Sequence, residues 1–214
     1  MKITTISVGA FQVNTYLVED ERRGRAVLID PGDEGERILR AVQESGSTLD
    51  AIWLTHAHVD HVGGIAAIKR VLNVPVYLHP DGEPLYRHAA EHGLIFGLHV
   101  EQPPRAERLL SDGDTLHVGD LVFSVMLAPG HAPGHVVIHG NGVAFVGDCL
   151  FAGSIGRTDL PLADARELVS SLEHIMSLED DTIVYPGHGP STTIGAERVS
   201  NPFLNGSVRI VGRP

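Results

Sequence analysis

Cysteine is almost absent from this sequence, because Cys149 is the single cysteine among 214 residues. This count excludes an intramolecular disulfide and fits a reducing cytoplasm. Apolar runs long enough to span a bilayer are also missing, and residues 1–12 lack the layout of a secretion signal. We therefore expect a cytoplasmic protein that has no membrane partner.

Basic residues are scarce as well. Only 16 lysines and arginines stand against 27 aspartates and glutamates, which gives a formal net charge of −11. Non-specific nucleic-acid binding needs basic patches that displace counterions, so this charge argues against a nucleic-acid partner. A hydrophobic content of 43% is that of a globular chain. The composition leaves the substrate and the oligomeric state open.

Low-complexity linkers and internal repeats are missing too, and short strand patterns alternate with helical ones. The helical patterns cover 34–45, 63–72 and 164–177, the last capped by Asp164, and 83–104 reads as a helix plus a surface loop. Strands are predicted at 3–7, 14–19, 26–30, 51–55, 74–78, 121–127, 135–139, 143–147 and 182–185. Two strand-rich blocks with helices between them predict an α/β fold built of layers.

The stretch from Thr55 to His61 carries three histidines and an aspartate in the pattern His56-x-His58-x-Asp60-His61. Imidazoles packed this closely suit a shared transition metal. The spacing is too tight for all four side chains to reach one ion from a regular helix or strand. A turn after the strand 51–55 would divide them between two neighbouring ions. A polar helix N-terminus with incidental histidines is the disfavoured alternative.

Three later strands also end in ligand-type residues. His131 lies in a turn rich in glycine and proline after 121–127, Asp148 follows 143–147, and His188 follows the strand near 184. Each signal is weak alone, because a single histidine after a glycine turn is more often structural. Together with the first motif they provide seven candidate ligands at four strand ends.

On these residues the chain resembles the metallo-β-lactamase fold superfamily over nearly its whole length. The resemblance implies a four-layer αβ/βα sandwich, with metal ions at one edge between the two sheets. It implies that His56, His58 and His131 hold the first ion. Asp60, His61 and His188 would hold the second, with Asp148 bridging both. Asp30, also part of the match, would orient the histidine loop without binding metal.

Two divalent ions are the cofactor that this ligand set implies. Imidazole and carboxylate ligands without thiolate favour zinc, and iron or manganese also fit. Two ions about 3.5–4 Å apart can lower the pKa of a shared water, which gives a bridging hydroxide nucleophile, while one ion polarises a carbonyl. Asp60 and Asp148 are the predicted catalytic carboxylates. No Ser-His-Asp set is evident, so we expect metal-assisted hydrolysis of an ester, thioester, amide or phosphoester.

A finer resemblance, to glyoxalase II (hydroxyacylglutathione hydrolase), rests on the segments 55–64, 129–135 and 147–160. It implies a thioester hydrolase and a small-molecule thioester partner, with S-lactoylglutathione the favoured example. Full-length glyoxalase II enzymes add a C-terminal helical region, for which this chain leaves no room after 201–203. We therefore expect one domain over 1–214, of the short YcbL-like type.

Other functions remain as alternatives. Persulfide dioxygenases share the fold and the loop style of 154–159, and they use one iron whose ligands would correspond to His56, His131 and Asp148. A non-enzymatic metal-binding module is disfavoured, because a purely structural site does not need open coordination positions. β-Lactam hydrolysis is disfavoured by the missing secretion signal. Nuclease activity is disfavoured by the acidic charge and by the lack of a domain that clamps nucleic acid.

Three residues near the predicted ligands have alternatives of their own. Arg157 either contacts a substrate carboxylate or forms an ordinary ion pair. His135 either supports a metal ligand from behind or only completes its turn. Cys149, beside Asp148, is favoured as a small buried hydrophobe over a thiol next to the metal.

Overall fold

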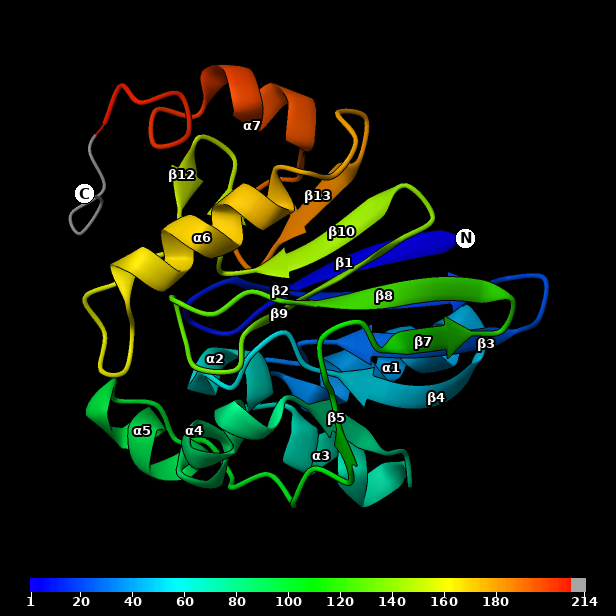
Figure 1. Cartoon of the computed structure of the whole chain (residues 1–214). Coiled ribbons are helices and arrows are strands. Elements are labelled where there is room, and N and C mark those ends of the chain that lie inside the picture. Colours follow the sequence, from blue (N-terminus) through cyan, green and yellow to red (C-terminus); the bar gives the residue numbers. More distant parts are fainter. Residues whose placement is uncertain (209–214) are drawn as a thin grey trace.

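Two six-stranded sheets lie face to face in this computed structural model, which describes residues 1–208 (Figure 1). The first sheet is antiparallel from β1 to β3 and parallel from β3 to β6. Its strands follow the chain in order: β1 (Lys2–Val8), β2 (Val13–Asp20), β3 (Arg25–Ile29), β4 (Thr48–Trp53), β5 (Val76–Leu78) and β6 (Arg108–Leu109).

The second sheet comes from the later half of the chain and pairs antiparallel, except that β10 and β13 run parallel. Its spatial order is β14 (Thr192–Thr193), β13 (Ile183–Pro186), β10 (Val143–Gly147), β9 (Val136–Gly140), β8 (Leu121–Leu127) and β7 (Thr115–Val118). A small separate hairpin, β11 (Leu150–Phe151) and β12 (Ser154–Ile155), follows β10.

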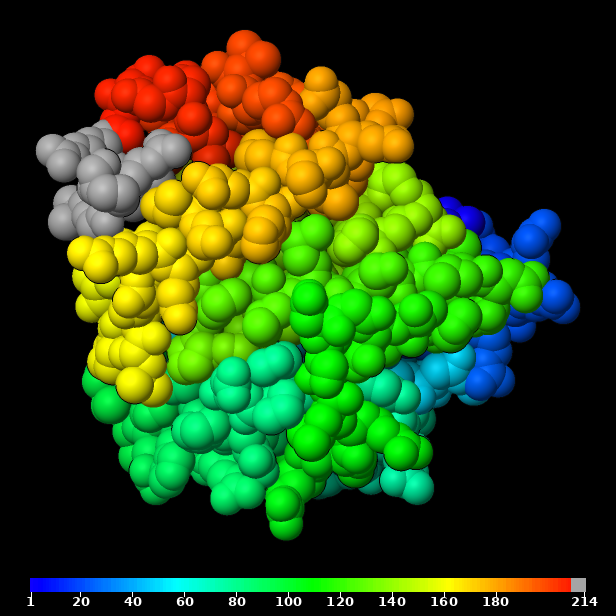
Figure 2. Space-filling view, in the orientation of Figure 1, coloured from blue at the N-terminus to red at the C-terminus, as the bar shows by residue number. Residues whose placement is uncertain are grey.

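Helices cover the outer face of each sheet (Figure 1). Against the first sheet lie α1 (Gly35–Ser45), α3 (Ile65–Val71) and α4 (Glu83–Arg87), while α2 (Val59–Val62), α5 (Ala89–Ile95) and the 3₁₀ turn η1 (Pro80–Gly82) complete that side. Against the second sheet lie α6 (Ala165–Ile175) and α7 (Ile194–Ser200). Figure 2 shows this division on the surface, with the yellow-to-red segments at one end and the cyan-to-green segments at the other.

Three buried apolar clusters fill the three spaces between these four layers. The central cluster joins the sheets, and Trp53 of the first sheet packs edge to face on Phe123 of the second, with ring centroids 5.8 Å apart. The outer clusters hold the helices, through Ile38 of α1 on one side and Leu168 of α6 on the other. Burial on both faces of the central strands therefore produces the predicted αβ/βα sandwich.

The apolar spacing and the capping residues predicted from the sequence form the helices α1 and α6 in the expected way. In α1, Ile38, Leu39 and Val42 form one buried face, and Gly46 ends the helix in the left-handed region at φ 72°. In α6, the Asp164 carboxylate accepts hydrogen bonds from the backbone N–H groups of Arg166 (2.7 Å) and Glu167 (3.2 Å). This contact confirms Asp164 as the N-cap.

Several sequence-based boundaries were wrong. The strand predicted at 51–55 is β4, which begins at Thr48 and ends at Trp53, so that Thr55 already lies in the following loop. The helix predicted at 63–72 begins at Ile65, and the one-turn helix α2 precedes it. The segment 83–104 holds two short helices instead of one.

The sequence pattern also missed several short elements: β6, β7, β11, β12, β14 and α7. The strands of two residues are too short for any period to be recognised. None of the helices in the described part of the chain combines the length and apolar character needed to cross a bilayer. One domain over 1–214 stays a prediction, and 209–214 lie outside the described residues.

Candidate metal centre

The seven predicted ligands follow the carboxyl ends of four strands. His56 and His58 lie in the loop after β4, and Asp60 and His61 lie on α2, which continues that loop. The other three follow β8, β10 and β13, in the order His131, Asp148 and His188. Strands β10 and β13 are parallel neighbours, so the residues that follow them leave the same edge of the second sheet. The sandwich brings that edge against the loop of the first sheet.

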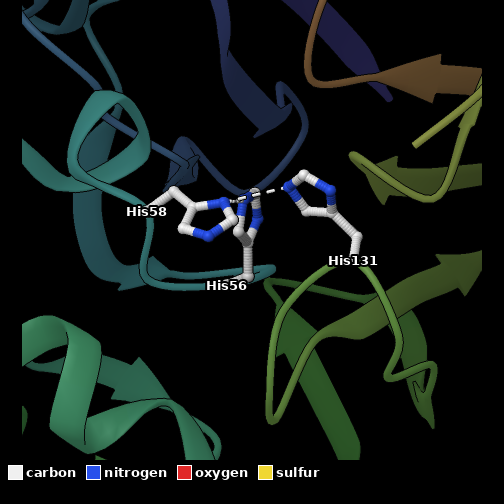
Figure 3. Close-up of side chains that lie close together, drawn as sticks. All are labelled: His56, His58 and His131. Atoms are coloured by element: carbon white, nitrogen blue, oxygen red, sulfur yellow. Dashed lines mark hydrogen bonds between the residues drawn. The ribbon is translucent and has the colours of Figure 1, made fainter. Parts of the chain in front are cut away.

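Three histidine nitrogens of this set converge on one point (Figure 3). His58 Nδ1 lies 3.1 Å from His56 Nε2 and 2.9 Å from His131 Nε2. The ring of His58 stands edge to face against both of the others, with interplanar angles of 85° and 89°. A divalent cation is well suited to this point, because three imidazole nitrogens can direct lone pairs at it.

The opposite ring nitrogens of two of these histidines are held from behind. His131 Nδ1 donates to the backbone carbonyl oxygen of Arg157 at 3.0 Å. His56 Nδ1 lies 3.1 Å from Thr55 Oγ1, which in turn donates to Asp30. A proton on each Nδ1 leaves Nε2 free to bind metal, which is the usual way in which outer contacts select a ligand tautomer.

A second cluster joins Asp60, His61 and His188. His188 Nε2 lies 3.3 Å from Asp60 Oδ2, and His61 Nε2 lies 3.9 Å from the same oxygen. His188 Nδ1 donates to the backbone carbonyl oxygen of Phe11 (3.0 Å), and His61 Nδ1 donates to Asp30 (3.0 Å). The Nε2 atoms of both histidines therefore face the Asp60 carboxylate. Each Nε2 presents a lone pair when its ring is neutral and an N–H when its ring is protonated.

The Asp148 carboxylate lies between the two clusters. Its Oδ1 is 3.4 Å from His61 Nε2, and its Oδ2 is 3.5 Å from His131 Nε2 and 3.6 Å from His188 Nε2. Asp148 Oδ1 and His61 Nε2 are buried without a hydrogen-bond partner among the described residues. Buried polar atoms without a partner are costly, and metal ions would satisfy both of these. The donor set therefore fits two metal ions, and the Asp148 carboxylate lies between the two clusters.

The electrostatics of the clusters agree with this fit. Burial lowers the pKa of His56 well below its ordinary value and lowers that of His58 to about 3, so these imidazoles stay neutral. Burial also acts to lower the pKa of His61, but the Asp148 and Asp60 carboxylates outweigh it and raise that pKa well above its ordinary value. In the metal-free protein, a protonated His61 provides part of the positive charge that a second ion would supply.

Asp30 organises the histidine loop from beneath. Its carboxylate accepts from the Thr55 backbone N–H (2.8 Å), from Thr55 Oγ1 (2.6 Å) and from His61 Nδ1. Its backbone adopts φ 49°, an uncommon conformation for aspartate that aims the side chain at the loop. Asp30, His56 and His61 also lie close enough to form a ligand group. Because the Asp30 oxygens already accept these bonds, the contacts favour the orienting role predicted for it.

A family model for the metallo-beta-lactamase superfamily matches residues 8–188, a span that includes all seven predicted ligands. The chain belongs to the metallo-beta-lactamase superfamily. This match and the solved structures below confirm the fold prediction. Among curated relatives, the hydroxyacylglutathione hydrolase GloC of Haemophilus influenzae is 39% identical and is matched over 96% of this chain and 99% of its own length. The probable metallo-hydrolase YqgX of Bacillus subtilis is 37% identical over 96% and 99%.

Solved structures of the superfamily agree closely with the fold. TTHA1623, crystallised in a di-iron-bound form, has a TM-score of 0.88 and 46% identity, with 94% of this chain and 100% of that one covered. The B3 metallo-beta-lactamase BLEG-1 has a TM-score of 0.87 and 37% identity, over 95% and 99%. ETHE1 from Myxococcus xanthus has a TM-score of 0.81 and 30% identity, over 96% and 85%. Family, relatives and ligand clusters together identify a metallo-hydrolase with a dinuclear metal site.

The remaining predicted residues of this superfamily member lie around the centre. The Arg157 guanidinium pairs with both oxygens of Asp159, at 2.6 and 2.7 Å, and the two side chains are exposed. The ion-pair alternative for Arg157 is thus present, and a substrate contact stays a prediction. Cys149 and His135 are both fully buried behind Asp148.

The sequence pattern missed contacts that orient the ligands. Thr55 links His56 to Asp30, and the carbonyl groups of Phe11 and Arg157 hold His188 and His131. Thr55 adjoins the histidine motif, and this position is the signal that could have pointed to it. A contact made by a backbone carbonyl depends on the path of the chain, so neither Phe11 nor Arg157 carried a sequence signal for this role.

Proposed function

We propose that this protein is a dinuclear metal-dependent hydrolase that cleaves a thioester, with a hydroxyacyl-glutathione such as S-lactoylglutathione as the substrate. The observation that carries the proposal is the completeness of the ligand set. Two groups of three donors face each other across the Asp148 carboxylate, and Asp148 lies within 3.6 Å of a histidine from each. Hydrolytic two-metal sites use this kind of arrangement.

The reaction adds water to the thioester carbonyl carbon and breaks the C–S bond, releasing a carboxylic acid and a thiol. Metal ions held by these ligands would supply an activated water and a positive charge opposite the developing oxyanion. Asp60 is the residue we assign to orienting that water, because its carboxylate is partly exposed and faces His188. Asp148 holds the two halves of the centre in register. Thr55 and Asp30 keep the histidine loop in place throughout.

The substrate class rests on two supports. The relative named hydroxyacylglutathione hydrolase matches this chain over nearly its full length. At the site, the exposed Arg157 guanidinium lies on the loop whose carbonyl holds His131, so it is placed to contact a substrate carboxylate. On the His188 side, Phe11 packs edge to face on Phe96 with ring centroids 6.1 Å apart. The loops beside the centre thus offer an arginine, paired with Asp159, on one side and an aromatic pair on the other.

Zinc is the metal we propose, because the donors are imidazole and carboxylate and include no thiolate. Iron is the main alternative, supported by the di-iron-bound form of TTHA1623, and manganese is the third. Metal analysis of the purified protein distinguishes them. A content near two ions per chain supports the proposal. One ion per chain, with the Asp60 cluster empty, would contradict a dinuclear centre.

The decisive experiment is a thioester panel read by release of free thiol, with S-lactoylglutathione, other acyl-glutathiones and acyl thioesters that lack glutathione. We expect hydrolysis of the acyl-glutathiones and little activity towards the smaller thioesters. A chromogenic cephalosporin belongs in the panel because of the similarity to BLEG-1. Hydrolysis of the cephalosporin with no thioester turnover would reverse the substrate assignment.

Asp148→Ala and His131→Ala should each reduce thioester hydrolysis to the level of the metal-free protein while the fold persists. Each change removes a donor from the metal centre and leaves the three apolar clusters intact. Far-ultraviolet circular dichroism checks the fold, and His174→Ala on the exposed face of α6 is the matched control. Undiminished turnover in a metal-free variant would exclude the mechanism.

A persulfide dioxygenase remains the second candidate. The structure of ETHE1 from Myxococcus xanthus, which has 30% identity, keeps this alternative in view. A single iron held by His56, His131 and Asp148 would leave Asp60, His61 and His188 without a role, although they also converge. Oxygen consumption by iron-loaded protein with glutathione persulfide tests this candidate. Oxygen uptake without thioester cleavage would favour it.

A further inference from the structure

A chain of hydrogen bonds runs from the backbone of Asp148 through His135 and Cys149. The backbone N–H of Asp148 donates to His135 Nε2 at 3.1 Å. His135 Nδ1 lies 3.4 Å from Cys149 Sγ, and the Cys149 thiol donates to the backbone carbonyl oxygen of Ala128 at 3.3 Å. His135, Cys149 and Ala128 are all completely buried. The chain therefore connects the loop after β10 to the ends of β8 and β9.

These contacts allow one arrangement of protons. Because the Asp148 N–H can only donate, His135 Nε2 must be the acceptor, and the proton of the neutral ring lies on Nδ1. The Nδ1–H then donates to Cys149 Sγ, whose own proton is directed at Ala128. Burial lowers the pKa of His135 and raises that of Cys149, which agrees with a neutral imidazole and an intact thiol.

The position of the His135 ring is fixed from two further sides. It stacks on the ring of His56, with centroids 4.7 Å apart and planes 22° apart. Gly147 brings the main chain close to it, since a Cβ at that position would lie 2.6 Å from His135 Nε2. The same glycine adopts φ 48°, in the left-handed region. His135 thus contacts the ring of His56, which belongs to the first cluster, and the backbone N–H of Asp148. The carboxylate of that same Asp148 faces both clusters.

We infer that His135, held in its Nδ1–H tautomer between the Asp148 N–H and Cys149 Sγ, is a positioning residue: it fixes Asp148 relative to His56 and so sets the place of the carboxylate between the two metal sites. The inference rests on the dinuclear centre of the proposed function and is independent of which substrate is cleaved. It assigns Cys149 a specific task, accepting a hydrogen bond from His135 Nδ1–H, beyond that of a small buried hydrophobe. Partners of this outer kind typically change metal affinity by about 10–100-fold.

The tautomer is tested directly by long-range ¹H–¹⁵N NMR of the imidazole side chains, in metal-free and in zinc-loaded protein. We expect His135 to show a protonated Nδ1 and an unprotonated Nε2 in both. In Cys149→Ala the Nδ1–H loses its acceptor, so we expect a minor population of the Nε2–H tautomer to appear, and we expect it to disappear again in Cys149→Ser, which keeps an acceptor. A protonated Nε2 in the unaltered chain would overturn the inference.

The positioning role is tested by metal affinity, measured without substrate by competition with a chromogenic chelator. His135→Phe keeps a stacking ring but leaves the Asp148 N–H without an acceptor. We expect it to bind the metal pair about 10–100-fold more weakly. His135→Gln, which retains an acceptor, should recover part of the loss. Cys149→Ala should fall between the unaltered chain and His135→Phe.

Leu172→Ala is the control that distinguishes a general loss of stability from a loss of the positioning role. It creates a cavity in the cluster between α6 and the second sheet. We expect Leu172→Ala to lower the unfolding midpoint while the folded protein keeps its metal affinity. If Leu172→Ala and His135→Phe lose equal amounts of metal affinity, His135 acts only as an ordinary core residue and the inference is wrong. Unchanged affinity in His135→Phe would also overturn the inference. None of these measurements uses thioester turnover. If the protein does not hydrolyse the proposed substrate, the metal-affinity and NMR results still test the role of His135.

Discussion

Gly187 determines how closely Asp148 and His61 approach each other. A Cβ at this position would overlap Asp148 Oδ1 and lie 2.7 Å from His61 Cε1. The backbone of Gly187 has little freedom to withdraw, because its N–H donates to Gly147 (2.8 Å) and its carbonyl accepts from Asn14 (2.7 Å). The absence of a side chain here is therefore a requirement of the ligand geometry.

Gly187→Ala should leave the fold intact and weaken metal binding by about 10–100-fold, because the methyl group must displace the carboxylate that faces both clusters. Chelator competition measures the effect. Gly195→Ala is the control, since it lies in α7, and its Cβ would come no closer than 3.0 Å to Asp180. Equal metal affinity in the two variants would show that Asp148 does not need its observed position.

At the scale of elements, Glu197 joins α7 to the hairpin that follows Asp148. Its side chain is buried and accepts from the Gly153 backbone N–H (2.8 Å), from Thr192 Oγ1 (2.7 Å) and from Asn201 Nδ2 (2.8 Å). Asn201 also donates to the carbonyl oxygen of Ser154 (3.0 Å), at the start of β12. These polar contacts join the two short elements, in addition to the apolar packing of Leu150 and Ile194 in the outer cluster.

Glu197→Ala should lower the free energy of unfolding by about 3 kcal/mol, because three donors lose a buried acceptor. Urea unfolding measures the change. Glu173→Ala, on the exposed side of α6, should shift stability by no more than about 0.5 kcal/mol. A loss below about 1 kcal/mol in Glu197→Ala would mean that water replaces these bonds readily, and that the hairpin is held by its other contacts.

For the whole molecule, the centre makes stability depend on pH in two opposite ways. Burial lowers the pKa of four histidines: His56, His58, His131 and His135. Below about pH 6.5 the unfolded chain binds protons on these histidines and the folded chain does not, so the free energy of unfolding falls as the pH falls. His61 and His188 have raised pKa values, because nearby carboxylates outweigh burial. The folded chain therefore keeps their protons above about pH 6.5, where the unfolded chain releases them.

The metal-free protein should be most stable near pH 6.5. Its free energy of unfolding should fall on the acid side towards the His58 pKa of about 3, and fall again on the alkaline side as His61 and His188 deprotonate. Zinc loading should abolish the alkaline fall, because metal replaces those protons, and should steepen the acid one. Urea unfolding across this pH range, with and without a chelator, measures both limbs. Stability that rises steadily from pH 6.5 to 9 in the metal-free protein would contradict the titration of His61.

Much of the fold was predictable because its signals are local. The apolar face of α1, the Asp164 cap and the buried central strands each depend on residues close together in sequence. The hairpin β11–β12 and α7 were not predictable, since contacts between distant residues, such as that of Gly153 with Glu197, help to hold them in place. The boundary of β4 was misplaced because Thr55, a good strand former, is held instead by Asp30.

The sequence by itself determined which side chains are available to a metal and where along the chain they occur, because ligand-type residues follow apolar runs at four separate points. Only the tertiary structure decided that His58 meets His131, that His61 meets Asp148, and that backbone carbonyls hold His131 and His188. Contacts of this kind join residues up to 177 positions apart. They exist because packing the two sheets together sets the distances between their edges, and no local pattern encodes those distances.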